Sequence, residues 1–403
     1  MLYTTRRNFL RTVTIGSVAM AGCAGKPRRT IREGSSGNMK IAYRTLGSTG
    51  FLATEIGFGC MNMANPELLM AAIDHGINYI DTANRYMNGR NEEIVGQVMK
   101  THRDKVFLTT KIGADKLKGI SSDIRSADIL PKLLETSIKR LQTDHVDLLL
   151  FHIIDNREQV LDETFMKFFD SARKKGLCRY VGVSTHYNHA EVVNAAVDSK
   201  FWEAVLVGYN YFSPPEVKES IARAHRAGLA VIAMKNLLRV QMDPPSFIPL
   251  SEIRNSKDSG MTSKQALIKW VLQDKNVDTT ILGMTAFEHL DEDIALMGMN
   301  FTDADRYKLS RYAESITAVT CRGVSGCTGC KERCPKGVSI SDFNRCVAYA
   351  DSYHALDMAL ENYQSLPFSS RINAFISCET CSVKCMKGLD LNRTVRRARE
   401  LFV

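Results

Sequence analysis

Short apolar runs alternate with amphipathic stretches from residue 41 to residue 299. The amphipathic stretches, such as Ile129–Leu141 and Pro215–Ala227, have the apolar spacing of surface helices. The apolar runs are short and rich in β-branched residues, which indicates strands. Eight strand–helix units of this length predict an α/β fold, a parallel sheet closed into a (β/α)8 TIM barrel. The eight predicted strands are Glu55–Cys60, Tyr79–Thr82, Val106–Ile112, Val146–His152, Tyr180–Thr185, Ala204–Asn210, Ala230–Lys235 and Thr279–Met284.

The structural alternative is an open, doubly wound sheet. A dinucleotide-binding sheet of that kind carries Gly-x-Gly-x-x-Gly after its first strand, and no such run follows Glu55–Cys60. Before this strand, Ile41–Phe51 contains Gly47-Ser-Thr-Gly50 and predicts a hairpin that could plug the bottom of the barrel. We therefore expect the barrel over residues 39–300 and a linker helix over residues 301–320.

Composition and charge argue against several classes of protein. The 403 residues are 44% hydrophobic and 24% charged, which is typical of a globular chain and not of a disordered or fibrous one. The sequence has no apolar run of the length expected for a polytopic membrane protein. The net charge of +9 comes from Lys and Arg scattered among 44 acidic residues, so we expect no nucleic-acid partner.

The first residues resemble an export signal. Two adjacent arginines, Arg6 and Arg7, precede a Phe-Leu pair and the small, weakly apolar residues 13–22, which is typical of a twin-arginine signal. Met20-Ala-Gly-Cys23 is similar to a lipoprotein cleavage box; if the box is used, Cys23 carries a lipid anchor, and otherwise the signal is cleaved ordinarily or retained. Residues 26–38 have the composition of a flexible tether. We expect residues 1–38 to be signal and tether, and the protein to be periplasmic or lipid-anchored on the outer side of a membrane.

Four polar side chains follow successive predicted strands. The chemistry of (β/α)8 barrels takes place at the C-terminal ends of the strands. Asp81 ends the second strand and is followed by Tyr86, Lys111 ends the third strand, and His152 ends the fourth. Each residue alone has an ordinary explanation as a strand cap, a rim aromatic, a solvated charge or a core histidine. All four at one mouth indicate an active site.

These residue types suit the reduction of a carbonyl. A carbonyl that accepts hydride needs a proton for its developing alkoxide. Tyr86 can donate this proton, and the Lys111 ammonium would lower the phenol pKa from its ordinary value of about 10. Asp81 would neutralise and orient Lys111, while His152 can hold the carbonyl oxygen by a hydrogen bond.

At these residues the chain resembles the aldo/keto reductase family. The resemblance covers residues 41–299 and rests on the stretches Asn78–Tyr86, Phe107–Lys111, Asp147–His152 and Arg179–Ser184. It implies a small-molecule substrate, and NADP- or NAD-dependent carbonyl reduction or its reversal. It also implies a catalytic tetrad of Asp81, Tyr86, Lys111 and His152.

The same resemblance implies a cofactor site that departs from the family pattern. Ser184 matches the family's carboxamide-binding serine, but Thr185 stands where asparagine is usual and Leu206 where glutamine is common. Met234–Leu237 replaces a Ser-Pro-Leu loop, and Lys235 within it is a candidate for binding the pyrophosphate.

The adenosine end of the implied cofactor site departs from the pattern as well. Gly283 and Thr285 precede a helix whose N-terminus can take a phosphate. Glu292 and Asp293 stand where Glu-Asn commonly contacts adenine, and residues 282–297 contain no Lys or Arg for a 2′-phosphate. The choice between NADP and NAD, and the loss of dinucleotide binding, therefore stay open.

Eight of the eleven cysteines lie between residues 321 and 385. Cys327–Pro335 and Cys378–Cys385 both have the spacing C-x2-C-x3-C, which resembles a ferredoxin-type run without its first cysteine. Residues 321–403 are therefore expected to form a mainly helical, ferredoxin-type domain with one or two 4Fe-4S clusters. Cys346 is an eighth ligand or a buried thiol, while a zinc site and disulfides are the alternatives. The candidate ligands are Cys321, Cys327, Cys330, Cys334, Cys378, Cys381 and Cys385.

The signal and the cysteine domain agree with each other, because the twin-arginine route exports folded, cofactor-loaded proteins. We expect a cluster to pass electrons between an electron-transfer partner and the barrel pocket. The alternative is an exported iron–sulfur electron-transfer or interaction protein whose barrel is not catalytic. The intact set of four strand-end residues favours the enzyme.

Overall fold

The structure is a computed structural model that describes residues 29–33, 40–113, 129–186, 188–237, 261–316, 321, 330, 334–335, 338, 340–351, 356–366, 371, 380–385 and 388–402. Within these ranges, no helix combines the length and the apolar character needed to cross a bilayer. The predicted export signal and its Cys23 lie outside the described residues.

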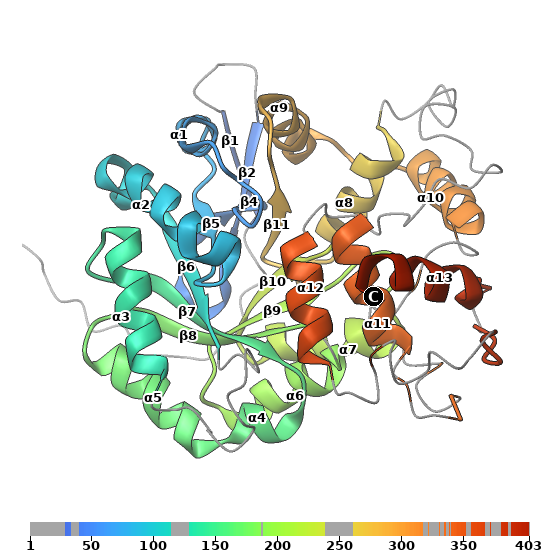
Figure 1. The fold of residues 1–403 in the computed structure, drawn as a ribbon. Helices are drawn as coiled ribbons and strands as arrows, with labels where there is room; N and C mark the ends of the chain where they lie inside the picture. Colours follow the sequence, from blue (N-terminus) through green and yellow to red (C-terminus); the bar gives the residue numbers. More distant parts are fainter. Residues whose placement is uncertain are drawn as a thin grey trace, which may run out of the picture.

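Eight parallel strands close into a barrel (Figure 1), as the alternating apolar runs predict. The ring closes where β11 (Thr279–Gly283) pairs with β4 (Ile56–Gly59). Strand residues are nearly all buried, because side chains fill the inside of the barrel and helices cover its outside. The open doubly wound sheet is therefore excluded. Between β4 and β11 the ring contains β5 (Tyr79–Asp81), β6 (Phe107–Ile112), β7 (Val146–Ile154), β8 (Cys178–Thr185), β9 (Ala204–Gly208) and β10 (Ala230–Met234).

Amphipathic helices surround the barrel and pack their apolar faces on the strands. Side-chain caps fix several helix starts: the Asn65 side chain accepts a hydrogen bond from the first turn of α1, and Thr262 forms a capping box at the start of α8. The barrel helices are α1 (Pro66–Asp74), α2 (Arg90–His102), α3 (Leu130–Leu141), α4 (Arg157–Leu161), α5 (Glu163–Lys174), α6 (His189–Ser199), α7 (Pro215–Arg226), α8 (Ser263–Gln273) and α9 (Phe287–Ala295).

A small antiparallel sheet closes the bottom of the barrel. Its strands β2 (Lys40–Thr45) and β3 (Leu52–Thr54) form the predicted hairpin. The turn between them packs against the start of β10: a Cβ on Gly47 would lie 2.3 Å from the backbone nitrogen of Ala230. Gly47 also has a φ of +48°, so the turn requires glycine for both space and backbone conformation.

Residues Thr30–Glu33, which composition assigns to the flexible tether, instead form strand β1. This strand pairs antiparallel with β2 and so extends the small sheet. Arg29, just before it, donates hydrogen bonds of 2.7 and 3.1 Å to the carboxylate of Glu55, which also accepts one of 2.8 Å from Arg44. Backbone pairing and a buried carboxylate therefore hold this segment on the barrel.

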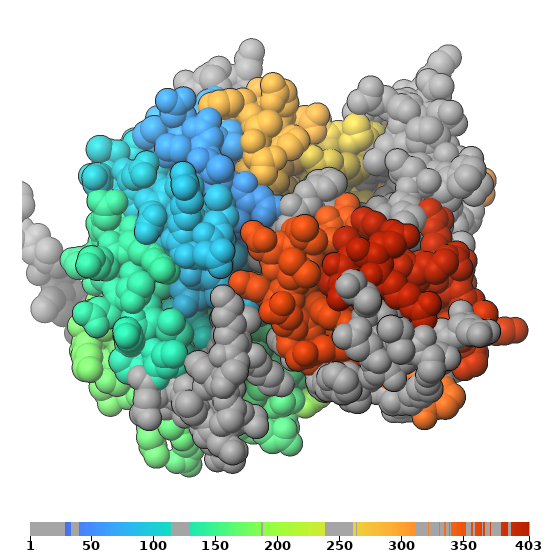
Figure 2. Space-filling model, viewed as in Figure 1, coloured from blue at the N-terminus to red at the C-terminus, as the bar shows by residue number. Residues whose placement is uncertain are grey.

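Further helices follow the barrel. α10 (Asp303–Ile316) lies within the predicted linker helix. The next three, which we call the C-terminal lobe, surround an apolar cluster that includes Phe343, Cys346 and Tyr363. Figures 1 and 2 show the lobe in orange and red beside the barrel. The lobe consists of α11 (Ile340–Asp351), α12 (Leu356–Ser365) and α13 (Leu391–Phe402).

The sequence has a helical pattern over Phe343–Tyr363, and the structure divides this stretch between α11 and α12. α11 and α12 pack against each other, instead of continuing as one helix. This arrangement encloses the apolar side chains of both helices in one cluster.

Candidate active site

The structure brings the four strand-end side chains together at the C-terminal mouth of the barrel. Lys111 Nζ donates hydrogen bonds to Asp81 Oδ1 at 2.5 Å and to the Tyr86 hydroxyl at 3.1 Å. The ring of His152 stands edge-on to that of Tyr86, with centroids 6.1 Å apart. All four side chains are buried. The Tyr86 hydroxyl therefore has an ammonium group on one side and an imidazole on the other.

A buried hydrogen-bond network holds the turn that carries Tyr86. The Thr82 carbonyl accepts a bond of 2.8 Å from Lys111, and the Thr82 hydroxyl donates one of 2.6 Å to Asn91 Oδ1. The Asn91 amide donates in turn to the carbonyls of Cys60 and Met63, in the loop after β4. Fully partnered polar groups of this kind fix the geometry of the residues above them.

Strained backbone is concentrated at the same mouth. Met87, Asn88, Ile153 and Lys235 have φ values of 52°, 56°, 59° and 57°. This left-handed region is uncommon for residues other than glycine, and it is a clear outlier for a β-branched residue such as Ile153. Strain of this kind persists where the surrounding structure imposes it, most often at functional sites.

Burial and charge set the protonation of the site. Burial works to lower the pKa of Lys111, but the Asp81 carboxylate and the Tyr86 hydroxyl raise it above its usual value, so Lys111 is a cation. Burial, with the positive charges of Lys111, Arg85 and Lys235, holds the pKa of His152 well below its usual value, so His152 is neutral. Among the described residues, neither ring nitrogen of His152 has a hydrogen-bond partner. One of them can therefore donate to a substrate oxygen.

The pKa of Tyr86 corrects one prediction. The sequence predicts that Lys111 brings this pKa below its ordinary value, and the ammonium does act in that direction. Burial acts more strongly and raises the pKa of Tyr86 above its ordinary value of 10.0. Tyr86 is therefore a protonated phenol at neutral pH, which suits a proton donor.

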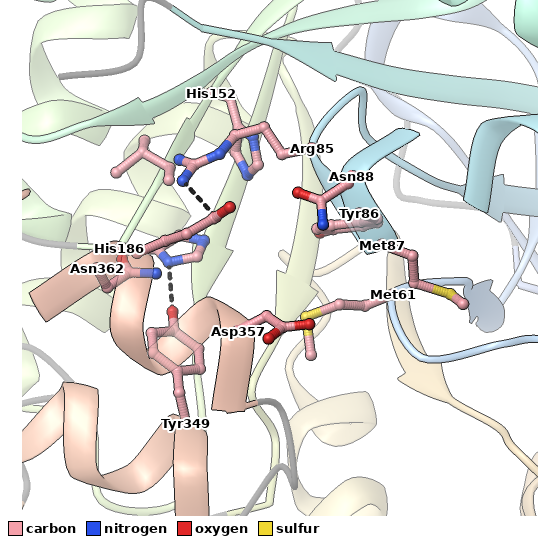
Figure 3. Close-up of a pocket in the computed structure, with 12 residues that line it drawn as sticks. Met61, Arg85, Tyr86, Met87, Asn88, His152, His186, Tyr349, Asp357 and Asn362 are labelled. Atoms are coloured by element: carbon pink, nitrogen blue, oxygen red, sulfur yellow. Dashed lines mark hydrogen bonds and ion pairs between the residues drawn. The ribbon is translucent and has the colours of Figure 1, made fainter. Parts of the chain in front are cut away.

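A pocket of about 550 Å³, counting its open mouth, lies over Tyr86 and His152 (Figure 3). One side of it comes from the barrel, and the other from α11 and α12 of the C-terminal lobe. The lining residues are Met61, Arg85, Tyr86, Met87, Asn88, His152, Ile153 and His186 of the barrel, and Tyr349, Asp357, Glu361 and Asn362 of the lobe.

Polar contacts hold the lobe on the barrel mouth. Arg85 Nη2 lies 3.0 Å from Glu361 Oε2 of α12. The Tyr349 hydroxyl of α11 lies 2.9 Å from His186 Nδ1 and accepts a hydrogen bond of 3.1 Å from Lys235 Nζ. The lobe is thus attached to residues that border the catalytic hydroxyl.

The predicted cofactor residues lie along the neighbouring rim. Ser184 and Thr185 are buried at the end of β8, and the Ser184 hydroxyl has no partner among the described residues. Such a hydroxyl fits a polar group of a bound ligand. Gly283 ends β11, and the backbone N–H of Thr285 lies 3.4 Å from the His289 ring at the start of α9. Lys235 is engaged by Tyr349.

The structure places a lysine from outside residues 282–297 beside Glu292 and Asp293. Lys264 of α8 places its Nζ 3.6 Å from Glu292 Oε2 and 3.9 Å from Asp293 Oδ1 of α9. Burial raises the pKa of Asp293 to about 6. The cation comes from the helix before the last barrel strand, so only the folded chain shows where it lies.

Five of the seven predicted metal ligands are in the described residues: Cys321, Cys330, Cys334, Cys381 and Cys385. All five pack against the apolar cluster of the lobe, so both cysteine runs meet at one core. Among the described residues, no disulfide joins these five cysteines to one another.

Cys327 and Cys378 lie outside the described residues. Within the part of the chain that the structure describes, no three metal-binding side chains are grouped closely enough to hold an ion. Cys346 is deeply buried; its Sγ lies 3.4 Å from the Asp342 carbonyl, and burial raises its pKa to about 12. It has the surroundings of a core thiol.

Several residues of the pocket are not predicted from the sequence. Arg85 lies three residues after the predicted strand end at Thr82, and His186 directly follows the strand end at Thr185, so both lie within three residues of a predicted strand end. Asp357 and Glu361 of α12 have no such local signal. They reach the mouth only through packing of the lobe on the barrel.

Comparisons with known proteins agree with this architecture. A sequence model described as "Aldo/keto reductase family" matches residues 55–239. An uncharacterized oxidoreductase of Bacillus subtilis, YqkF, is 29% identical over 283 residues, which are 62% of this chain and 89% of that protein. L-Galactose dehydrogenase of Arabidopsis thaliana is 23% identical over 291 residues, or 64% of this chain and 88% of that protein.

Solved structures show the same barrel. An aldo/keto reductase from Klebsiella pneumoniae, in complex with NADP and acetate, is 26% identical and gives a TM-score of 0.55 over 66% of this chain and 93% of that one. The holo form of an aldo-keto reductase from Bacillus halodurans, at 22% identity, gives a TM-score of 0.56 over 67% and 95% of the two chains. The latter likeness concerns the fold alone.

Proposed function

We propose that the barrel of this chain is an oxidoreductase of the aldo/keto reductase type, which transfers hydride between NADP and a carbonyl or alcohol group of a small molecule. The match of residues 55–239 to the family model and the likeness to the oxidoreductase YqkF support this proposal. One observation carries the proposal. Buried Asp81, Lys111, Tyr86 and His152 meet at the floor of a pocket that is open to a small molecule.

The four residues divide the proton chemistry among them. In the reductive direction Tyr86 donates its hydroxyl proton to the substrate oxygen, and Lys111 stabilises the phenolate that remains. Asp81 keeps Lys111 charged and in place, and neutral His152 donates a hydrogen bond to the same substrate oxygen. In the oxidative direction the phenolate of Tyr86 takes up the proton.

A bound dinucleotide would supply or accept the hydride. Ser184 and Thr185 are the residues that would hold its carboxamide, and the unpartnered Ser184 hydroxyl fits this role. Lys235 and Thr285 would bind phosphate. Glu292 and Asp293 would contact the adenosine end, where Lys264 provides the positive charge that favours NADP over NAD.

Tyr86→Phe tests the catalytic proposal. We expect reduction of an aldehyde by NADPH to fall about 10²- to 10⁴-fold, since the proton donor is lost. Circular dichroism should not change, because the ring is retained. Tyr307→Phe is the matched control, since Tyr307 is 67% exposed on α10. Undiminished turnover in Tyr86→Phe would favour the non-catalytic barrel.

Lys264→Glu tests the cofactor preference. We expect the KM for NADPH to rise about tenfold or more, because a carboxylate would repel the 2′-phosphate, while the KM for NADH stays nearly unchanged. Equal effects on both KM values would contradict the preference for NADP.

We also propose that the C-terminal lobe holds one or two 4Fe-4S clusters, which exchange electrons with a partner. Cysteine thiolates are the usual ligands of such clusters. Support comes from the five described cysteines of the predicted ligand set, which pack against one apolar core. Cys327 and Cys378, outside the described residues, complete the proposed ligand set.

Anaerobic purification tests the cluster proposal. We expect iron and acid-labile sulfide in equal amounts, and a visible absorption that dithionite bleaches. Cys330→Ser should lower the iron content, whereas Cys178→Ser should not, because Cys178 is buried in barrel strand β8. Zinc without sulfide would overturn the proposal.

Export by the twin-arginine route, with or without a lipid on Cys23, remains our proposal for localisation. Replacing Arg6 and Arg7 with lysine should keep the protein in the cytoplasmic fraction. Unchanged fractionation of this variant would contradict the proposal.

A further inference from the structure

The wall of the pocket that α12 provides is acidic. Asp357, Glu361 and Asn362 line this wall of the pocket that contains Tyr86. Figure 3 shows Asp357 and Asn362 on the side of α12. Carboxylate and amide oxygens accept hydrogen bonds from hydroxyl groups. Carboxylates also repel an anion brought into the same pocket. The wall therefore suits a substrate that donates hydrogen bonds and carries no negative charge.

Arg85 is the one lysine or arginine among the described lining residues, and Glu361 neutralises it. The two side chains are 3.0 Å apart and only 15% and 27% exposed, so water screens their attraction only in part. Arg85 lines the same pocket as Tyr86 and His152, and its positive charge acts on the pKa of His152. Removing the charge of Glu361 would leave a net positive charge here, which attracts a substrate carboxylate.

We propose that Glu361 is a specificity-determining residue, which masks Arg85 so that the pocket accepts uncharged, hydroxyl-bearing carbonyl compounds and rejects carboxylates. This inference rests on the proposed reductase function. The amide groups of Asn88 and Asn362 are placed to contact substrate hydroxyls, and the side chains of Met61 and Met87 provide an apolar surface for the carbon skeleton. A selectivity element from outside the barrel thus acts on the catalytic mouth.

The test compares 4-(hydroxymethyl)benzaldehyde with 4-carboxybenzaldehyde, which share one ring and differ in charge. For the full chain with NADPH, we expect kcat/KM for the hydroxymethyl compound to be about tenfold higher or more. Glu361→Gln keeps the shape of the side chain and uncovers Arg85. We expect it to raise kcat/KM for the carboxylate about tenfold, and to change kcat/KM for the hydroxymethyl compound by a much smaller factor, because the glutamine amide oxygen still accepts a hydrogen bond.

Three further variants separate the proposal from simple disruption. Glu400→Gln removes an exposed carboxylate of the same lobe, on α13. It should leave unchanged the ratio of kcat/KM for the hydroxymethyl compound to kcat/KM for the carboxylate. Arg85→Gln combined with Glu361→Gln should lose the gained turnover of the carboxylate. Asp357→Asn removes negative charge from the wall without touching the Arg85–Glu361 pair, and should raise carboxylate turnover about twofold to fivefold.

The outcomes distinguish this inference from the function on which it rests. If wild type reduces both aldehydes but prefers the carboxylate, or if neither Glu361→Gln nor Asp357→Asn changes the ratio, the selectivity proposal is wrong and the reductase stands. If Glu361→Gln loses turnover of both compounds, the effect of Asp357→Asn on carboxylate turnover decides whether the selectivity proposal stands. If wild type reduces no aldehyde, both proposals are wrong.

Discussion

The hydroxyl of Tyr86 is subject to two opposing influences. Burial favours the neutral phenol, and the Lys111 ammonium at 3.1 Å favours the phenolate. Burial is the stronger of the two, so the group holds its proton through neutral pH. Lys111 still lowers the cost of releasing this proton at the moment of transfer.

The pH dependence of Lys111→Met tests this balance. In wild type, we expect reductive kcat/KM to stay constant through neutral pH and to fall only above about pH 10, where Tyr86 ionises. Without the ammonium, the pKa of Tyr86 rises further. The fall in the variant should therefore move to higher pH, and its plateau should be about 10²-fold lower. A fall at lower pH than in wild type would contradict this account.

At the scale of elements, α11 links the two parts of the molecule. Phe343, Cys346 and Val347 point into the apolar cluster of the lobe. Tyr349, on the same helix, contacts His186 and Lys235 at the barrel mouth. Packing of the lobe core therefore determines where one wall of the pocket stands.

Phe343→Ala tests this link. Loss of a buried phenylalanine typically costs about 3–5 kcal/mol, and here the loss falls on the lobe and not on the barrel. We expect an additional unfolding transition at low urea, detected by limited proteolysis of the lobe, while circular dichroism of the barrel persists. Leu356→Ala is the control, because Leu356 is 50% exposed at the start of α12 and should cost little. A single, unshifted transition in Phe343→Ala would contradict the prediction.

At the scale of the whole molecule, two buried histidines lie where the barrel meets the lobe. Burial and nearby positive charges hold the pKa values of His152 and His186 well below the usual value of 6.5. Below about pH 6.5 the unfolded chain binds protons on both residues and the folded chain does not. The stability they contribute above this pH is therefore lost as the pH falls.

Urea unfolding of His186→Gln at pH 7.5 and pH 5 tests this dependence. We expect the acid-induced loss of stability to be smaller than in wild type, because the variant has no imidazole to protonate on unfolding. His225→Gln provides a control of opposite sign: the Asp278 carboxylate, 3.5 Å from His225 Nδ1, raises the pKa of His225, so this residue stabilises the fold at acid pH. The acid-induced loss should therefore be larger in His225→Gln. Equal losses in all three proteins would contradict the argument.

The sequence predicts the barrel and its four catalytic candidates because both signals are local. Runs such as Leu148–Phe151 are apolar throughout, and Asp81 or Lys111 ends a strand wherever the strand lies. The acidic wall could not be predicted, because Glu361 and Arg85 are 276 positions apart in the sequence. No pattern in α12 indicates that they form an ion pair. Strand β1 could not be predicted because it is itself an exposed edge strand with little apolar pattern. Lys264 could not be predicted because it belongs to a different helix from Glu292.

The ion pair between Arg85 and Glu361 has a consequence for the order of events during synthesis. Domains generally fold from the N-terminal end as the chain leaves the ribosome. The barrel strands are complete at Gly283, while the helix that provides Glu361 is still to be translated. A nascent chain thus holds Tyr86 and Lys111 in a barrel without this wall, and the proposed selection between substrates begins only after α12 has been translated.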